Sequence, residues 1–133
     1  MIYLLDTNAW VSYLNSPTSP VRNRLKRFSP QEIATCSVVK AELYYGAYKS
    51  SRRDVNLALL SNLFEEIQSY PFDDAAADVY GRIRADLTKR GTPIGPNDLL
   101  ISAISLANDL VLITHNVSEF GKVAELKFED WKI

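Results

Sequence analysis

The 133-residue chain is poor in the residues on which many enzymes and secreted proteins depend. It contains one cysteine, one histidine and five glycines. Because Cys36 stands alone, no internal disulfide can form, which fits a reducing compartment. The single histidine, His115, leaves no pair of imidazoles for acid–base catalysis. With neither cysteine nor histidine clusters, any metal site would have to be built from oxygen ligands.

Other absences narrow the class further. No apolar run approaches the ~18 residues of a membrane span. The start has no basic region, and Asp6 interrupts its apolar run, so we expect no signal peptide, no membrane association and a cytoplasmic location. No phosphate-binding P-loop, GxGxxG turn or Ser-His-Asp arrangement is present. The formal net charge of −1 argues against a strongly basic nucleic-acid binder.

The patterns that are present predict an α/β protein, a three-layer sandwich with a mostly parallel central sheet, in a single domain over residues 1–133. Apolar runs alternate with amphipathic segments along the whole chain. Strands are expected up to residue 5 and over 33–36, 69–72 (at an edge), 110–114 and 126–128. Helices are expected over 9–14, 20–28, 37–48, 57–67, 75–90 and 99–107.

The first strand ends at a carboxylate. Residues 2–5 are apolar, and Asp6, Thr7 and Asn8 follow them directly. Ligands of open α/β sheets bind at the carboxyl ends of the strands, where Asp6 is expected. Asp6 can equally serve as the N-cap of the next helix. This stretch alone leaves both interpretations open.

Two further acids stand alone in apolar helices. Glu42 is the only carboxylate between Glu32 and Asp54, in a helix that is apolar almost all round and therefore expected to be buried, with Ser37 as its N-cap. Asp98 follows the stiff segment 92–96 and opens the apolar helix over 99–107. A buried, unpaired carboxylate is costly. Glu42 can instead pair with a nearby base, and Asp98 can be a helix cap.

A fourth acid, Glu119, follows the most apolar strand. Strand ends and the starts of the following helices share one edge of a parallel sheet, so Asp6, Glu42, Asp98 and Glu119 can meet there. Four clustered carboxylates require cations. Oxygen ligands alone favour Mg²⁺ or Mn²⁺, and such a site suits metal-assisted phosphodiester hydrolysis. If four of the 16 acids are neutralised in this way, the 15 basic residues give the remaining surface a modest positive excess.

Four segments resemble the acidic motifs of the PIN-domain family, and more narrowly those of the VapC toxins of bacterial toxin–antitoxin pairs. They occur in the family's order over the length of the chain. They are LLDTN (4–8), SVVKAEL (37–43) with YGA (45–47), IGPND (94–98) and THNVSEF (114–120). The resemblance implies a Mg²⁺- or Mn²⁺-dependent endoribonuclease that acts on RNA such as tRNA, forms a homodimer and is held inactive by a VapB-like antitoxin.

The resemblance also implies roles for individual residues. Asp6, Glu42 and Asp98 match the three acids of the family's core site, where Asp6 and Asp98 would bind the principal metal. Glu119 departs from the pattern, since many relatives have Asp in its place, and it would help to hold a second metal or a bridging water. The supporting polar residues would be Thr7, Asn8 and Asn116. The candidate contacts to RNA phosphates are Lys40, Lys49, Arg52 and Arg53, which can equally form a solvated surface.

Two other functions are compatible with the same residues. Asp6 at a strand end can be the nucleophile of a phosphatase or phosphoacceptor domain, although that chemistry usually needs a second acid beside the first. The chain can also be an RNA- or partner-binding module that does not cleave. The presence of all four acids favours the nuclease over both.

Overall fold

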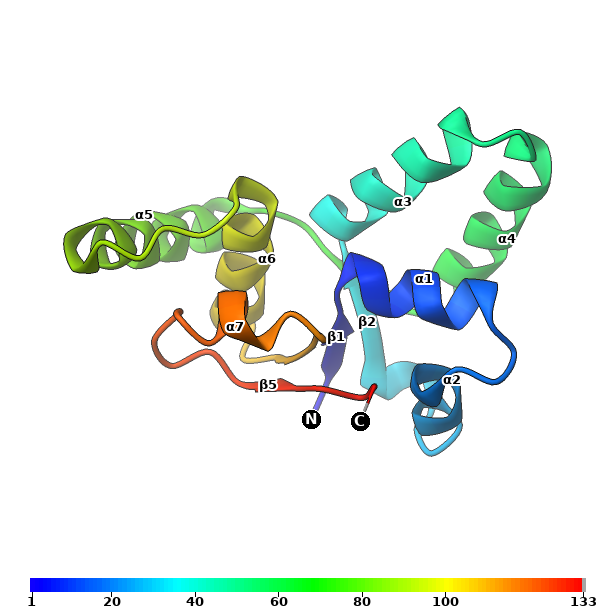
Figure 1. Cartoon of the computed structure of the whole chain (residues 1–133), viewed down its shortest axis with the longest axis horizontal. Helices are drawn as coiled ribbons and strands as arrows, with labels where there is room; N and C mark the ends of the chain where they lie inside the picture. Colours follow the sequence, from blue (N-terminus) through cyan, green and yellow to red (C-terminus); the bar gives the residue numbers. More distant parts are fainter. Residues whose placement is uncertain (133) are drawn as a thin grey trace.

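The computed structural model describes residues 1–132, which form a parallel sheet flanked by helices (Figure 1). The expected α/β sandwich is confirmed, and the sheet is parallel throughout, with the strand order β3-β2-β1-β4-β5. The strands are β1 (Tyr3–Leu5), β2 (Ile33–Cys36), β3 (Gln68–Tyr70), β4 (Val111–Ile113) and β5 (Phe128–Glu129). The helices are α1 (Thr7–Asn15), α2 (Pro20–Leu25), the short 3₁₀ turn Pro30–Glu32, α3 (Ser37–Lys49), α4 (Arg53–Glu66), α5 (Asp74–Arg90), α6 (Pro96–Ala107) and α7 (Val117–Phe120).

The central strand β1 explains the apolar start of the chain. Its Leu4 and Leu5 are fully buried, because neighbouring strands and helices cover both faces of the sheet. From β1 the chain proceeds to β2 and β3 on one side and later returns to β4 and β5 on the other. The order of the strands therefore reverses between β1 and β4, which is where open α/β sheets form a crevice for ligands.

The long helix α5 begins and ends as its sequence predicts. Asp73 is the N-cap and accepts a hydrogen bond from the backbone N–H of Ala76 at 3.0 Å. Gly91 ends the helix in the left-handed conformation, with φ of 70°, which glycine adopts at little cost. The edge position predicted for the short strand near Pro71 is also confirmed, since β3 is an outer strand. None of the helices over residues 1–132 combines the length and apolar character that crossing a bilayer demands.

The expectation that the helix over 37–48 is buried on most sides is wrong. Only Val39, Leu43 and Ala47, spaced four residues apart on one face of α3, are buried. Tyr45 and Tyr48 are 66% and 62% exposed. One face suffices to cover the sheet, so the aromatic residues on the remaining faces stay at the surface.

Several boundaries also differ from those expected. Cys36, not Ser37, is the N-cap of α3, and it makes no side-chain capping bond. The helix expected over 57–67 begins earlier, so Arg53 lies in α4 and not in a loop. The segment around Glu119 forms the single-turn helix α7, and the last strand lies two residues later than expected. Local sequence patterns define such ends poorly, because tertiary contacts decide the final turn.

Candidate active site

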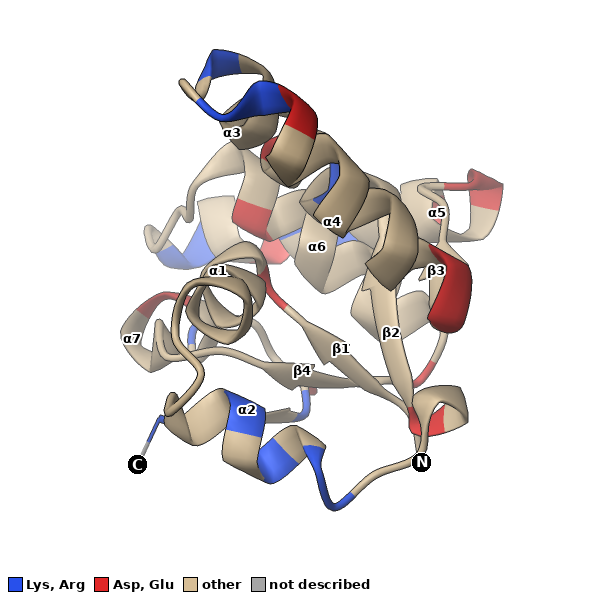
Figure 2. Cartoon of the chain, turned by 90° about the vertical axis from the view of Figure 1, so that its right-hand side faces the viewer, with Lys and Arg blue, Asp and Glu red and all other residues tan. Residues whose placement is uncertain are grey.

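The acidic residues converge on the crevice between β1 and β4. The backbone N–H of Asp6 donates to the carbonyl oxygen of Ile113 at 3.0 Å, which joins the residue that follows β1 to β4. In Figure 2, acidic segments lie around the carboxyl end of β1, between α1, α6 and α7. This edge is also where the strand order reverses. The geometry therefore places the candidate site where the fold provides a natural crevice.

Asp6 is the N-cap of α1, and it lies at the carboxyl end of β1, where the sequence predicts a ligand site. Its side chain is 6% exposed, and one carboxylate oxygen accepts the N–H of Ala9 at 2.8 Å, capping α1. Burial raises its pKa above the usual value, and the nearby Glu42 carboxylate raises it further. Hydrogen bonding to the Thr114 hydroxyl and to Ala9 lowers this pKa in part. A carboxylate has about four acceptor sites on its two oxygens, so these hydrogen bonds leave Asp6 able to bind a cation.

Glu42 is held by side chains from two other helices. The hydroxyl of Thr7, at the start of α1, donates to one Glu42 oxygen at 2.5 Å. The side-chain amide of Asn97, in the first turn of α6, donates to the other oxygen at 3.2 Å. The lone acid of α3 therefore accepts hydrogen bonds from two neutral donors. The alternative of an ion pair with a nearby base is not what the structure contains.

Asp98 is the third residue of α6, and neither it nor Asn97 caps that helix. Gly95 occupies the N-cap position without a side-chain capping bond. The pKa of Asp98 is raised to about 6, first by burial and then by the negative charges of Glu119, Asp6 and Glu42. All three other candidate acids therefore act electrostatically on Asp98. This mutual repulsion is the strongest physical sign that the four carboxylates form one group.

Glu119 is tied to the backbone at the start of α6. One of its oxygens accepts the N–H of Gly95 at 2.9 Å, across 24 positions of sequence. The other lies 3.5 Å from the ammonium nitrogen of Lys122. These contacts fix α7 against α6 and give Glu119 a structural task besides any role in metal binding.

The supporting residues are near the acids in different ways. Thr7 touches Glu42 directly, whereas Asn8 and Asn116 line a pocket with Asp6. Nothing in the sequence indicates that Asn97 supports Glu42, because no local pattern connects it with a residue 55 positions earlier.

The donor set of this site fits Mg²⁺ or Mn²⁺. Carboxylate and amide oxygens are the hard ligands that these cations prefer. The pKa of Asp98 is raised partly by neighbouring negative charges, and a cation would relieve this repulsion. Within residues 1–132, no three carboxylate, imidazole or thiolate side chains are already drawn together as a closed metal cage. An ion that keeps several of its waters and a few carboxylates needs no such cage.

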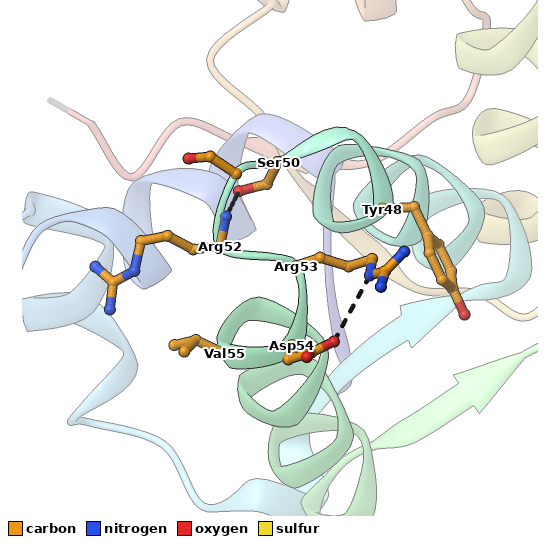
Figure 3. A pocket seen from close by; sticks show the side chains of 7 residues that line it. Tyr48, Ser50, Arg52, Arg53, Asp54 and Val55 are labelled. Atoms are coloured by element: carbon orange, nitrogen blue, oxygen red, sulfur yellow. Dashed lines mark hydrogen bonds and ion pairs between the residues drawn. The ribbon is translucent and has the colours of Figure 1, made fainter.

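The four basic candidates lie at different distances from the acids. Lys49 stacks on Tyr45, and both line a pocket with Glu42 and Asn97. Lys40 instead stacks on Phe64 of α4, with its ammonium 4.8 Å from the ring centre. The remaining two, Arg52 and Arg53, line a separate hollow at the turn between α3 and α4 (Figure 3).

That separate hollow is open and basic. Arg53 pairs with the neighbouring Asp54 at 3.6 Å, and both side chains are largely exposed. Arg52 points away from that pair in Figure 3. Of the four basic residues, Lys49 alone shares a pocket with a candidate catalytic acid.

Comparison with known proteins agrees with this geometry. The PIN domain family matches residues 3–126. Ribonuclease VapC2 of Rickettsia felis is 35% identical over 132 residues, with 98% of each chain covered. The tRNA(fMet)-specific endonuclease VapC of Shigella flexneri is 35% identical over 129 residues, with 97% of each covered.

Solved structures show the same similarity. The crystal structure of VapBC2 from Rickettsia felis bound to a DNA fragment from their promoter contains a chain that matches with a TM-score of 0.90 and 33% identity, covering 98% of this chain and 99% of that one. A chain in the structure of VapBC-1 from nontypeable Haemophilus influenzae matches with a TM-score of 0.89 and 31% identity over the full length of both.

The sheet is parallel, and the candidate acids lie where its strand order reverses, which together with these matches defines a nuclease fold. The chain belongs to the PIN-domain family. Its full-length relatives at 31–35% identity are ribonucleases. Within the family it is a VapC-type toxin ribonuclease of a toxin–antitoxin system, which confirms the function that the sequence motifs predicted.

Proposed function

We propose that this ribonuclease is an endonuclease that depends on Mg²⁺ or Mn²⁺ and uses Asp6, Glu42, Asp98 and Glu119 at the end of β1. The observation that carries the proposal is the electrostatic coupling of Asp98 to the other three acids. Carboxylates whose negative charges repel one another destabilise a fold, but they are suited to holding a divalent cation. The proposal places the activity in the cytoplasm, where RNA is available.

Each acid has a role that follows from its contacts. Asp6 and Asp98 would hold the principal ion. When bound, the ion supplies an activated water and neutralises charge on the phosphoryl group. Glu42, fixed by Thr7 and Asn97, orients the attacking water or completes the metal ligands. Glu119, already bonded to Gly95, supports a second ion or a bridging water.

The neutral polar residues act on the orientation of these acids. Thr7 fixes the Glu42 carboxylate by a direct hydrogen bond, and Asn8 and Asn116 lie in the pocket beside Asp6. Partners of metal ligands commonly matter 10–100-fold for metal affinity or activity. Lys49, beside Glu42, is the strongest candidate for binding an RNA phosphate, with Lys40, Arg52 and Arg53 as more distant contributors.

We further propose a structured RNA such as tRNA as the substrate. A relative 35% identical over nearly its whole length is named a tRNA(fMet)-specific endonuclease. Sequence-specific recognition of RNA generally targets single-stranded loops, whose bases are accessible, and tRNA offers such loops.

The direct test is metal-dependent cleavage. Purified protein incubated with total RNA, and separately with initiator tRNA, is expected to give discrete fragments with Mn²⁺ or Mg²⁺ and none with EDTA. Mapping of the fragment ends identifies the bond. Glu42→Gln should lose most activity, whereas Glu65→Gln, a matched change on exposed α4, should retain it. RNA that stays intact at high protein concentration with metal would refute the proposal.

We propose an antitoxin of the VapB type as the regulatory partner. An apolar groove of about 310 Å³ opens between α1, α3 and α4 and reaches Thr7 and Glu42 at one end. Its apolar lining consists of Val11, Leu14, Leu43, Ala47, Leu59 and Leu60. An amphipathic segment of a partner would fill it and bring a basic side chain to the acids. The Rickettsia felis relative was solved as VapBC2 and the Haemophilus influenzae relative as VapBC-1.

We also propose that the chain forms a homodimer. Tyr44, Tyr45 and Tyr48 on α3 are 36%, 66% and 62% exposed, and neighbouring exposed aromatic residues are typical of interfaces. Sedimentation at micromolar concentration is expected to give a dimer. Tyr45→Arg should shift it toward monomer, whereas Val117→Arg, at a residue 41% exposed on α7, should not. A wild-type monomer at this concentration would contradict the proposal.

A further inference from the structure

A second pocket is lined by Asp6 and does not include Glu42. It has a volume of about 420 Å³, and nearly all the residues that line it are polar. Asn8 comes from α1, His115 and Asn116 come from the turn after β4, and Lys132 comes from the end of the described chain. The fold thus places the only histidine and a lysine next to the most buried acid of the candidate site.

The segment that carries Lys132 is anchored firmly. Trp131 is 1% exposed and stacks on Phe28, with ring centres 5.2 Å apart and planes 4° from parallel. Its ring also packs against Tyr3 of β1, and its indole N–H donates to Glu129 at 3.0 Å. The backbone that carries the Lys132 side chain is therefore held in place.

Asp130 connects the two basic residues of the pocket. One of its oxygens accepts the backbone N–H of Lys132 at 2.9 Å. The other lies 2.9 Å from Nδ1 of His115, and the Asp130 side chain is 12% exposed. With Nδ1 occupied, Nε2 is the only ring nitrogen that His115 can offer to a ligand.

Each of two pockets combines a candidate acid with a basic residue. One contains Glu42 and Lys49, and the other contains Asp6, His115 and Lys132. Lys132 is near enough to act electrostatically on Asp6. A phosphodiester bound over the acids would therefore continue, in either direction, toward a basic residue.

We propose that the pocket formed by α1, the 115–116 turn and Lys132 is a subsite for the nucleotide adjacent to the scissile bond, with Lys132 and His115 binding its phosphate and Asp130 as a positioning residue. The polar residues Asn8 and Asn116 meet the ribose or base edge. This inference rests on the proposed function, because it assumes that the scissile phosphate lies over Asp6.

The test measures RNA binding without cleavage. A fluorescently labelled single-stranded RNA of twelve nucleotides is titrated with wild type and variants in EDTA at several salt concentrations. Lys132→Gln is expected to weaken binding about 10-fold, as loss of a charge-assisted hydrogen bond does. It should also reduce the slope of log affinity against log salt by about 0.7, the contribution of one phosphate contact on a single strand.

Lys127→Gln is the matched control. Lys127 also lies near the end of the chain, and it pairs with Asp109 at 2.8 Å. These two residues precede β5 and β4, so they lie at the amino ends of the strands, away from the candidate site. The Lys127→Gln substitution removes the same charge and should leave the affinity and the salt slope unchanged.

The role of Asp130 has its own readout. Asp130→Asn keeps an oxygen for the Lys132 N–H and removes the charge beside His115. It should weaken RNA binding about 3-fold in wild type and have little effect in His115→Gln, because a positioning residue acts through its partner. A purely structural residue would instead give equal losses in both backgrounds.

Two results would overturn the subsite: equal affinity and salt slope for Lys132→Gln and Lys127→Gln, or no binding of the oligonucleotide by wild type. Failure of the proposed function appears elsewhere, as absence of metal-dependent cleavage. The two failures are distinguishable, because the binding experiment contains no metal and needs no cleavage.

Discussion

Replacing Asp98 with asparagine is expected to reduce RNA cleavage by at least about 100-fold, the upper end of what partners of metal ligands typically contribute. The substitution keeps the size of the side chain and removes one of the coupled charges. In wild type, Mg²⁺ at a hundredfold excess over its Kd should stabilise the fold by about 2.7 kcal/mol. For a chain of this length that is a rise in Tm of roughly 10 °C. The rise should shrink in the variant.

The same substitution should change how metal-free stability depends on pH. The pKa of Asp98 is about 6 in the folded state, above the ordinary 3.8. Between these two values the folded state binds more protons than the unfolded state, so stability from this group falls as pH rises. The contribution is present below 3.8 and lost above about 6. Asp98→Asn should therefore remove this decline and melt at least as high as wild type at pH 7 without metal.

The control is Asp78→Asn on α5, where the acid is 79% exposed and lies only in a surface pair with Arg82. Thermal melting across a metal titration, beside the cleavage assay, checks all three consequences. Equal metal-induced shifts of Tm in Asp98→Asn and wild type, with cleavage intact, would show that Asp98 takes no part in metal binding or cleavage. The proposed mechanism would then be wrong.

Replacing Leu59 with glutamate is expected to release the ribonuclease from its antitoxin. Leu59 lies on α4, is 48% exposed and lines the apolar groove that leads to Glu42. A carboxylate there would have to be desolvated against the apolar face of the partner, which costs several kcal/mol and thus 100-fold or more in affinity. Cleavage by the variant alone should be unchanged, because the Leu59 side chain can supply neither a metal ligand nor a hydrogen bond to the acids.

Val55→Glu is a closely matched control, since Val55 is also on α4 and also 48% exposed, but it lines the hollow at the α3–α4 turn and not the groove. Binding is measured by calorimetry against the product of the neighbouring small gene, and inhibition by the cleavage assay. If Leu59→Glu remains fully inhibited, or if the complex leaves cleavage active, the groove is not where the antitoxin acts.

Local patterns predicted much of the scaffold and led to the four candidate acids. An apolar run followed by Asp6 indicates a buried strand with a carboxylate at its end, whatever else the chain contains. The helix expected over 75–90 agrees with α5 to within one residue, because its ends depend on the neighbouring caps Asp73 and Gly91. The parallel sheet followed from the alternation of strands and helices, since parallel strands need such crossovers.

Tertiary structure decided how the acids are held and what surrounds them. Asn97 reaches Glu42 across 55 positions, and Glu119 accepts the N–H of Gly95 across 24. The exposure of Tyr45 depended on which face of α3 meets the sheet, and an apolar sequence does not reveal this.

The pocket beside Asp6 shows the same division most clearly. His115, Asp130 and Lys132 are unremarkable polar residues in sequence, and they come together only because β4 and β5 are neighbours and Trp131 is buried. The acids could be found from sequence because a carboxylate after an apolar run is a local anomaly. Their partners could not, because hydrogen bonds between distant segments depend on how the helices and strands pack.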